Sequence, residues 1–188
     1  MAKPSLTYAA LLRGVNVGGK NKLPMKDLTA LFEKAGCVSV TTYIQSGNVV
    51  FSADAECAKT LAPVITRKIE ERFGYRVPVL LRSDRQLASV IRDNPYLREG
   101  APEKELYVVF LADAPPAEKI KSLDPARSLP DTFRVSGQEI YLHLPDGVAD
   151  SKLTNAWFDT KLSTVSTVRN WATVLRLYAM TDQLSERR

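Results

Sequence analysis

The feature that most constrains the fold is a pattern written twice along the chain. Each copy holds a Ser-Gly turn followed by an amide residue, between two short runs rich in β-branched and aromatic side chains. The first copy runs from Tyr43 to Phe51 and the second from Phe133 to Tyr141, so an aromatic residue stands four positions either side of each central glycine. Each copy is typical of a β-hairpin, and the repetition predicts two similar structural units.

The segments around the two hairpins follow one order. The first half is expected to hold a strand (7–13), a helix (25–35), a hairpin (40–52), a helix (about 60–73, with Pro63 in its first turn), a strand (77–82) and a trailing helix opened by the capping box Ser83–Gln86. The second half is expected to hold a strand (105–111), a helix (115–123), a hairpin (132–144), a helix (151–162), a short strand (164–168) and a last helix that carries Val174, Leu177 and Leu184 on one face.

The order β-α-β-β-α-β is that of the ferredoxin-like unit, in which helices cover one face of a four-stranded antiparallel sheet. We therefore predict an α+β fold of two tandem ferredoxin-like (α/β-plait) units over residues 1–93 and 105–188. Residues 94–104 contain Pro95, Gly100 and Pro102 and are expected to form a linker.

The hairpins also predict which side chains share a face. If the first hairpin is centred on Gly47, Tyr43 lies opposite Phe51, and Gln45 lies opposite Val49. In the second unit the same reasoning places Phe133, Tyr141 and His143 on the open face. It places Ile140, Leu142 and Leu144 in the helix-packed core. We expect the open faces to cover each other or a second subunit in a homo-oligomer. The alternative is a base-stacking platform, although both hairpins lack the basic-glycine-aromatic signature of ferredoxin-like RNA-binding modules.

Composition is ordinary for a soluble globular chain of 188 residues, with 45% hydrophobic and 25% charged residues. No apolar run approaches the ~20 residues of a membrane span, and Met1–Pro4 leads into a strand without a cleavage site, so we expect a cytoplasmic protein. Cys37 and Cys57 lack metal-ligand spacing and are expected to be reduced, packed thiols, with a redox pair as the alternative.

The net charge of +5 is concentrated in the first half. Residues 1–93 hold 14 Lys and Arg against 8 Asp and Glu, whereas residues 94–188 hold 12 against 13. A basic half attracts phosphates, nucleic acid or acidic partners, and an excess of this size also occurs in ordinary soluble proteins.

The segment from Arg13 to Pro24 concentrates what an anion-binding loop needs. It joins a strand to a helix, and it carries glycines and cations together: Arg13, Gly14, Gly18, Gly19, Lys20 and Lys22, with Asn16 between them. Gly14 to Lys20 has the G-x-x-x-x-G-K spacing of a phosphate loop, but Asn21 stands where the magnesium-binding Ser or Thr belongs, and Pro24 delays the helix. We reject a Walker-type ATPase and retain a generic anion site; the alternative is a plain turn.

Two further segments are candidates. The first hairpin turn carries Gln45, Ser46 and Asn48, of which Gln45 adds an amide that turn chemistry does not require. The start of the last helix carries Arg169, Asn170 and Trp171, where Asn170 is expected to be the N-cap and free amides would face a ligand. Both segments also fit a purely structural role.

Familiar catalytic machinery is not evident. The one histidine, His143, lies mid-strand, and nothing in the sequence brings Ser46 or either cysteine to it. Asp146 and Asp150 flank a glycine turn rather than forming a metal site. No catalytic residue, metal or cofactor is assigned, and an enzyme of unrecognised type stays open.

The motifs together resemble the bacterial domain-of-unknown-function family 1697. They are Arg13–Lys20 with Pro24-Met25, Thr42–Val49, Ser151–Ala156 and Thr167–Trp171, in that order over nearly the whole chain. The resemblance implies a bacterial cytosolic protein with two ferredoxin-like subdomains, and it implies no activity.

Two hypotheses of different class follow. The first is a binding module for a phosphorylated metabolite, nucleotide or nucleic acid that uses the Gly14 loop and the Ser46 turn, which the ferredoxin-like topology brings to one edge. The second is a structural or interaction module whose polar motifs form a buried network that locks the two halves together.

Overall fold

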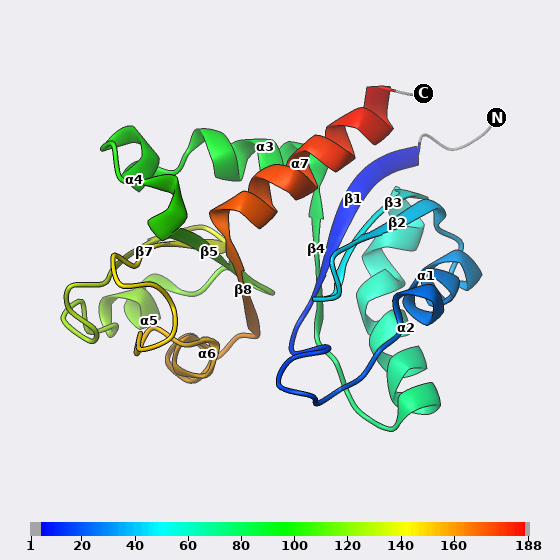
Figure 1. Ribbon diagram of the computed structural model, residues 1–188, viewed down its shortest axis with the longest axis horizontal. Helices are drawn as coiled ribbons and strands as arrows, with labels where there is room; N and C mark the ends of the chain where they lie inside the picture. Colours follow the sequence, from blue (N-terminus) through cyan, green and yellow to red (C-terminus); the bar gives the residue numbers. More distant parts are fainter. Residues whose placement is uncertain (1–4, 187–188) are drawn as a thin grey trace. The chain divides into compact units, whose positions relative to one another are not determined.

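The computed structural model describes residues 5–186 and confirms the duplicated fold (Figure 1). The first unit contains β1 (Ser5–Leu12), α1 (Met25–Lys34), β2 (Val38–Tyr43), β3 (Asn48–Asp54), α2 (Ala55–Phe73) and β4 (Val79–Ser83). The second contains β5 (Leu106–Leu111), α5 (Ala117–Lys121), β6 (Thr132–Ser136), β7 (Glu139–His143), α6 (Asn155–Leu162) and β8 (Ser166–Asn170). Their sheets have the strand orders β2-β3-β1-β4 and β6-β7-β5-β8, all antiparallel, as in the ferredoxin-like unit. The leading segment Met1–Pro4 lies outside the described residues.

The helices α1 and α2 cover one face of the first sheet (Figure 1). Alternate residues of β1 and β3 point into this core because side chains alternate along a strand. The core includes Leu12, Phe32, Phe51, Ile65 and Ile69, all fully buried. The rings of Phe32 and Phe51 lie 5.2 Å apart between helix and sheet. The second unit has an equivalent core under α6, which contains Ile140, Leu142, Leu144 and Phe158. The prediction that Ile140, Leu142 and Leu144 lie in the core is confirmed.

Helix α2 begins five residues earlier than the sequence predicts. Asp54 caps it, because its Oδ1 accepts the Cys57 N–H at 2.8 Å. Pro63 therefore lies in the helix interior and not in the first turn, and the sequence-based position is wrong. Pro63 is exposed, so the backbone group that it leaves unpaired lies toward solvent.

Each β-α-β-β-α-β run is followed by a trailing helix, α3 (Asp84–Arg92) and α7 (Trp171–Glu186). The predicted capping box is confirmed: Ser83 N–H donates to Gln86 Oε1 at 2.8 Å, and Gln86 N–H donates to Ser83 Oγ at 3.2 Å. Asn170 caps α7, as predicted, by accepting the Thr173 N–H at 2.9 Å.

The division between compact units falls inside both trailing helices. One unit comprises the chain up to Ala88 together with the chain from Arg176, and the other comprises Ser89–Leu175. The residues expected to form a linker instead hold α4 (Pro95–Arg98) and the 3₁₀ turn η1 (Glu103–Glu105), which belong to the second unit. No helix within residues 5–186 has the length and apolar character needed to cross a bilayer.

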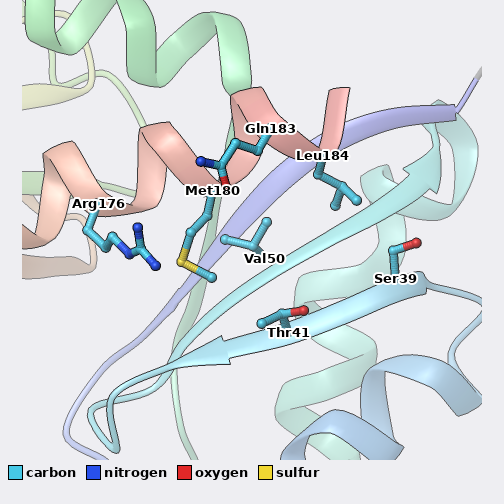
Figure 2. Close-up of a pocket in the computed structure, with 7 residues that line it drawn as sticks. All are labelled: Ser39, Thr41, Val50, Arg176, Met180, Gln183 and Leu184. Atoms are coloured by element: carbon cyan, nitrogen blue, oxygen red, sulfur yellow. The ribbon is translucent and has the colours of Figure 1, made fainter. Parts of the chain in front are cut away.

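The end of the chain's last helix lies over part of the open face of the first sheet. Residues of α7 from Arg176 onward lie over β2 and β3 (Figure 2), and Ser185 Oγ lies 3.0 Å from Thr7 Oγ1 on β1. Val50, which lines a pocket against α7, is almost fully buried. In the second unit α4 lies against β7 on the corresponding face, where the Tyr96 and His143 rings are 5.6 Å apart.

The predicted pairing of the aromatic residues is wrong in both hairpins. In the first, Tyr43 pairs with Asn48 and Thr42 with Val49, so Tyr43 and Phe51 lie on opposite faces. The cause is a four-residue turn in which Gly47 is the last residue and not the apex. Since Phe51 lies in the core, the first sheet has no paired aromatic platform on its open face.

In the second hairpin the turn has two residues, Gly137 and Gln138, and the strands pair Phe133 with Leu142. Phe133 therefore packs in the helix-covered core, whereas Tyr141 and His143 lie on the other face, as expected for those two. In a two-residue turn the centre of the hairpin lies between the two turn residues and not on Gly137. The face predicted for the side chains of one strand is therefore reversed.

The two turn glycines meet different surroundings, and this difference gives a matched test. Both have positive φ, +75° at Gly47 and +60° at Gly137. A Cβ on Gly47 would lie 2.4 Å from Val15 Cγ2 and 2.7 Å from Leu12 Cβ, whereas a Cβ on Gly137 would meet nothing within 4 Å.

We expect Gly137→Ala to cost about 1 kcal/mol of unfolding free energy, from backbone strain alone. Gly47→Ala should cost at least about 2 kcal/mol, because overpacking adds to the same strain. Urea unfolding of both variants measures the difference. Equal losses would mean that the Gly47 turn moves away from Val15 at little cost.

Candidate functional site

The loop between β1 and α1 is a small hairpin of its own. Val17 and Lys20 form an isolated antiparallel bridge in which Lys20 N–H donates to Val17 O at 3.1 Å. Gly18 and Gly19 occupy the tip with φ of +57° and +73°, a combination that only glycine adopts without strain. The tip residues Val17 to Lys20 are all exposed. Helix α1 begins only at Met25, so Lys20 does not open the helix as the lysine of a phosphate loop does.

Asn16 holds this loop to the neighbouring hairpin turn. Its Nδ2 donates to the carbonyl oxygens of Leu23, at 2.9 Å, and Gln45, at 2.8 Å. Its Oδ1 accepts the Leu23 N–H at 2.8 Å. Asn16 has φ +56°, a left-handed conformation that asparagine tolerates better than most residues. The predicted juxtaposition of the Gly14 loop and the Ser46 turn is therefore observed, and Asn16 joins them.

The hairpin turn is held from within. Asn48 is fully buried, and its Nδ2 donates to Ser46 Oγ at 2.9 Å. Gly47 O accepts the Leu12 N–H at 2.8 Å, which draws the turn against the end of β1. Ser46 and Asn48 thus shape the turn, whereas Gln45 is exposed and its side-chain amide forms no hydrogen bond with the described part of the chain.

A groove of about 620 Å³ opens where loop, turn and helix meet. Its lining residues come from all three segments: Asn16, Gly19, Lys22, Leu23, Pro24, Met25, Lys26 and Gln45. Lys22 and Lys26 are exposed, and neither forms an ion pair within residues 5–186. The lining contains no carboxylate.

The N-terminus of α1 opens into this groove without a side-chain cap. Pro24 occupies the capping position and provides no hydrogen-bonding side chain. The first amides of a helix have no partner within the helix, and they carry the positive end of its dipole. Asp27 in the first turn is ion-paired with Arg72, which offsets its charge.

The candidate residues from the sequence lie in both units, with three of them in the second unit and the others in the first. Asn16, Gly19, Lys22 and Gln45 line the groove, Gly18 and Lys20 lie at the loop tip, and Ser46 and Asn48 form the adjacent turn. Arg13 is half-buried at the end of β1, with its N–H bonded to Pro78 O at 3.0 Å. Arg169, Asn170 and Trp171 belong to the second unit.

Those three second-unit residues have internal roles. Asn170 caps α7, and Trp171 is buried. Arg169 Nη1 donates to Thr167 Oγ1 and to Val168 O, both at 2.8 Å. Burial lowers the pKa of Arg169 to about 10, which leaves the guanidinium charged at neutral pH.

Sequence reasoning missed Lys26 and the uncapped helix end. The available signal was Pro24 itself, because a proline at the capping position cannot satisfy the helix amides that Ser, Thr, Asp or Asn would bind. Lys26 adds a cation in the first turn, where acidic residues are the favoured type.

His143 contacts a carboxylate and an aromatic ring. His143 Nε2 lies 3.0 Å from Glu105 Oε2, and its ring faces Tyr96. The part of the chain that is described contains no cluster of three or more His, Cys, Asp and Glu side chains able to hold a metal.

Burial raises the pKa of the Cys37 thiol to about 12, with the neighbouring Cys57 as a second cause. Cys37 and Cys57 are both free, and neither is among the residues that line the groove.

Substituting Asn16 tests its role as the link between loop and turn. Asn16→Asp keeps the acceptor for the Leu23 N–H and removes both donated bonds, so we expect a loss of about 1–3 kcal/mol in unfolding free energy. Asn21→Asp is the matched control, because Asn21 also has a positive φ and donates one bond, to Gly14 O at 2.9 Å. Urea unfolding should show the larger loss for Asn16→Asp; a loss no larger than that of Asn21→Asp would show that the link contributes little.

Comparisons with known proteins agree with this architecture. The family model described as "Protein of unknown function (DUF1697)" matches residues 6–141, which include the loop and turn motifs and end before the two C-terminal motifs. The solved structure of the conserved bacterial protein SP0830 from Streptococcus pneumoniae is similar with a TM-score of 0.73 at 19% sequence identity, over 95% of this chain and 99% of that one, and shows the fold alone. No curated protein matches significantly. The chain belongs to the DUF1697 family.

Proposed function

We propose that this protein binds a small anionic molecule, of the phosphorylated-metabolite or nucleotide class, in the groove between the Gly14 loop, the Ser46 turn and α1. The observation that carries the proposal is the uncapped N-terminus of α1, which opens between Lys22 and Lys26 in a groove without a carboxylate. Helix amides and nearby cations together form a common phosphate-binding arrangement.

The size and rigidity of the groove support a small ligand. Its volume of about 620 Å³ lies within the range of small-molecule sites. The Asn16 bonds fix loop and turn before a ligand arrives, which lowers the ordering cost of binding. The Gln45 amide at the rim supplies a further donor and acceptor.

Binding, rather than catalysis, fits the chemistry of the lining. The groove offers cations, backbone amides and one side-chain amide, and none of its lining residues is a histidine, cysteine or carboxylate. Both cysteines of the chain are free thiols, which suits a reducing cytoplasm, and a cytoplasmic location is part of the proposal.

Pyrophosphate is the first probe, because it carries the proposed charge without any base or sugar. Titration calorimetry at low ionic strength should detect binding that weakens as salt is added, since exposed charges are screened. In Lys22→Gln/Lys26→Gln, we expect the dissociation constant to rise at least tenfold.

Lys34→Gln is the matched control, because Lys34 is an exposed lysine at the opposite end of the same helix. It should leave pyrophosphate affinity within about twofold of the parent, since an exposed charge a helix length away is largely screened. Equal weakening in both variants would attribute the effect to net charge, and unchanged affinity in the double variant would exclude the groove. Competition by a short single-stranded oligonucleotide separates a nucleic-acid ligand from a small one.

The second candidate function is that of a structural module, and the internal bonds of Asn16, Asn48 and Asn170 favour it. Gln45 separates the two functions. Its side chain is exposed, so Gln45→Ala should change the unfolding free energy by less than ~0.5 kcal/mol and should weaken pyrophosphate binding. A loss above ~1 kcal/mol, with binding unchanged, would favour the structural role.

A further inference from the structure

A second, smaller pocket lies in the first unit, between the open sheet face and α7 (Figure 2). Its volume is about 180 Å³. The strands contribute Ser39, Thr41 and Val50, and the helix contributes Arg176, Met180, Gln183 and Leu184. None of these residues lines the groove at the start of α1.

A bulge in β2 shapes one wall of this pocket. Val38 pairs with Ser52 and Thr41 with Val50, so two residues of β2 stand opposite one residue of β3. Ser39 lies in the bulge with φ +53°, a conformation that costs a non-glycine residue energy. Ser39 and Thr41 both line the pocket.

The floor of the pocket is apolar. Figure 2 shows Met180 and Leu184 extending from the helix toward the sheet, on which Val50 lies. Val50 is almost fully buried, whereas Met180 and Leu184 are partly exposed. A short aliphatic group on this floor would remove their exposed surface from water.

One end of the pocket carries an unpaired positive charge. Arg176 is exposed and lies over the Tyr43 ring at 6.0 Å, and no carboxylate within residues 5–186 forms an ion pair with it. The pocket lining has no acidic residue. A guanidinium presents a planar fork of donors that matches a carboxylate. The hydroxyls of Ser39 and Thr41 and the Gln183 amide add neutral donors.

We propose that this pocket binds a short-chain aliphatic monocarboxylate, with the carboxylate on Arg176 and the tail on Val50, Met180 and Leu184. The pocket volume of about 180 Å³ leaves room for a branched acid of four or five carbons. The site is independent of the proposed anion groove.

The methionines provide a readout that separates the two sites. Met180 lines this pocket and Met25 lines the groove, and the chain has only three methionines. In protein labelled with ¹³C at the methionine methyl groups, isovalerate should shift the Met180 signal and leave the Met25 signal in place. Pyrophosphate should do the reverse if it binds the groove. Met180→Leu and Met25→Leu assign the two signals.

Charge and shape are tested separately in the intact chain. Isovaleramide has the same shape without the charge and should bind at least tenfold more weakly than isovalerate. Arg176→Gln should reduce isovalerate affinity at least tenfold; Arg67→Gln, a charge removal at an exposed position of α2, should not change it. Thr41 is exposed on the edge strand, so Thr41→Phe places a large side chain where it fills the pocket. This variant should abolish the isovalerate-induced shift of the Met180 signal.

The proposal fails if isovalerate up to 50 mM, on the order of fifty times a dissociation constant of about 1 mM, leaves the Met180 signal unmoved. It also fails if isovalerate and isovaleramide bind equally, or if Arg176→Gln binds isovalerate as the parent does. A Met25 shift with isovalerate would assign the acid to the anion groove instead. Native methyl spectra of each variant without ligand show that a lost shift does not come from unfolding.

Discussion

A four-stranded sheet has two faces, and the two helices of a β-α-β-β-α-β unit cover only one of them. In the first unit the second face carries Ala9, Leu11 and Val50, which would expose apolar surface at a cost of roughly 25 cal/mol per Å². The end of α7 covers part of this face, with Leu177 and Thr181 buried and Ser185 hydrogen-bonded to Thr7. The 180 Å³ pocket lies where this cover meets the bulged edge of β2, so the need to cover the sheet also creates a cavity.

The duplication extends to individual side-chain contacts. Arg82 pairs across the sheet with Ala9, and Arg169 pairs with Val108, at equivalent positions of β4 and β8. Each arginine donates from Nη1 to the carbonyl of the residue before it, at 2.9 Å in Arg82 and 2.8 Å in Arg169. The repeats differ at the turns: Gly47 packs tightly against β1, whereas Gly137 has open space around it. The groove lies in the first repeat, where the Gly14 loop and the Ser46 turn lie side by side.

Local signals in the sequence predicted the element order because each has a short-range physical cause. The Ser83–Gln86 capping box and the Asn170 cap depend on neighbours within three residues, and both form as predicted. The predicted strand register is wrong because the pairing in a hairpin depends on the length of its turn. The same Ser-Gly signal occurs in a four-residue turn in the first hairpin and in a two-residue turn in the second. The covering helix could not be predicted from its own segment, because the surface it covers lies more than a hundred residues earlier in the chain.

The candidate sites show the same limit. The glycines, Lys22 and Gln45 of the loop and turn signalled a site, and the groove is lined by several of them. Asn16 and Asn48 carried the same signal, yet their side chains hold the backbone in place. A polar motif thus mixes residues that build a loop with residues that face its ligand, and only their hydrogen-bond partners separate the two. By that criterion Lys22, Lys26 and Gln45 are the side chains left to act on a ligand, because their polar groups have no partner within the described residues.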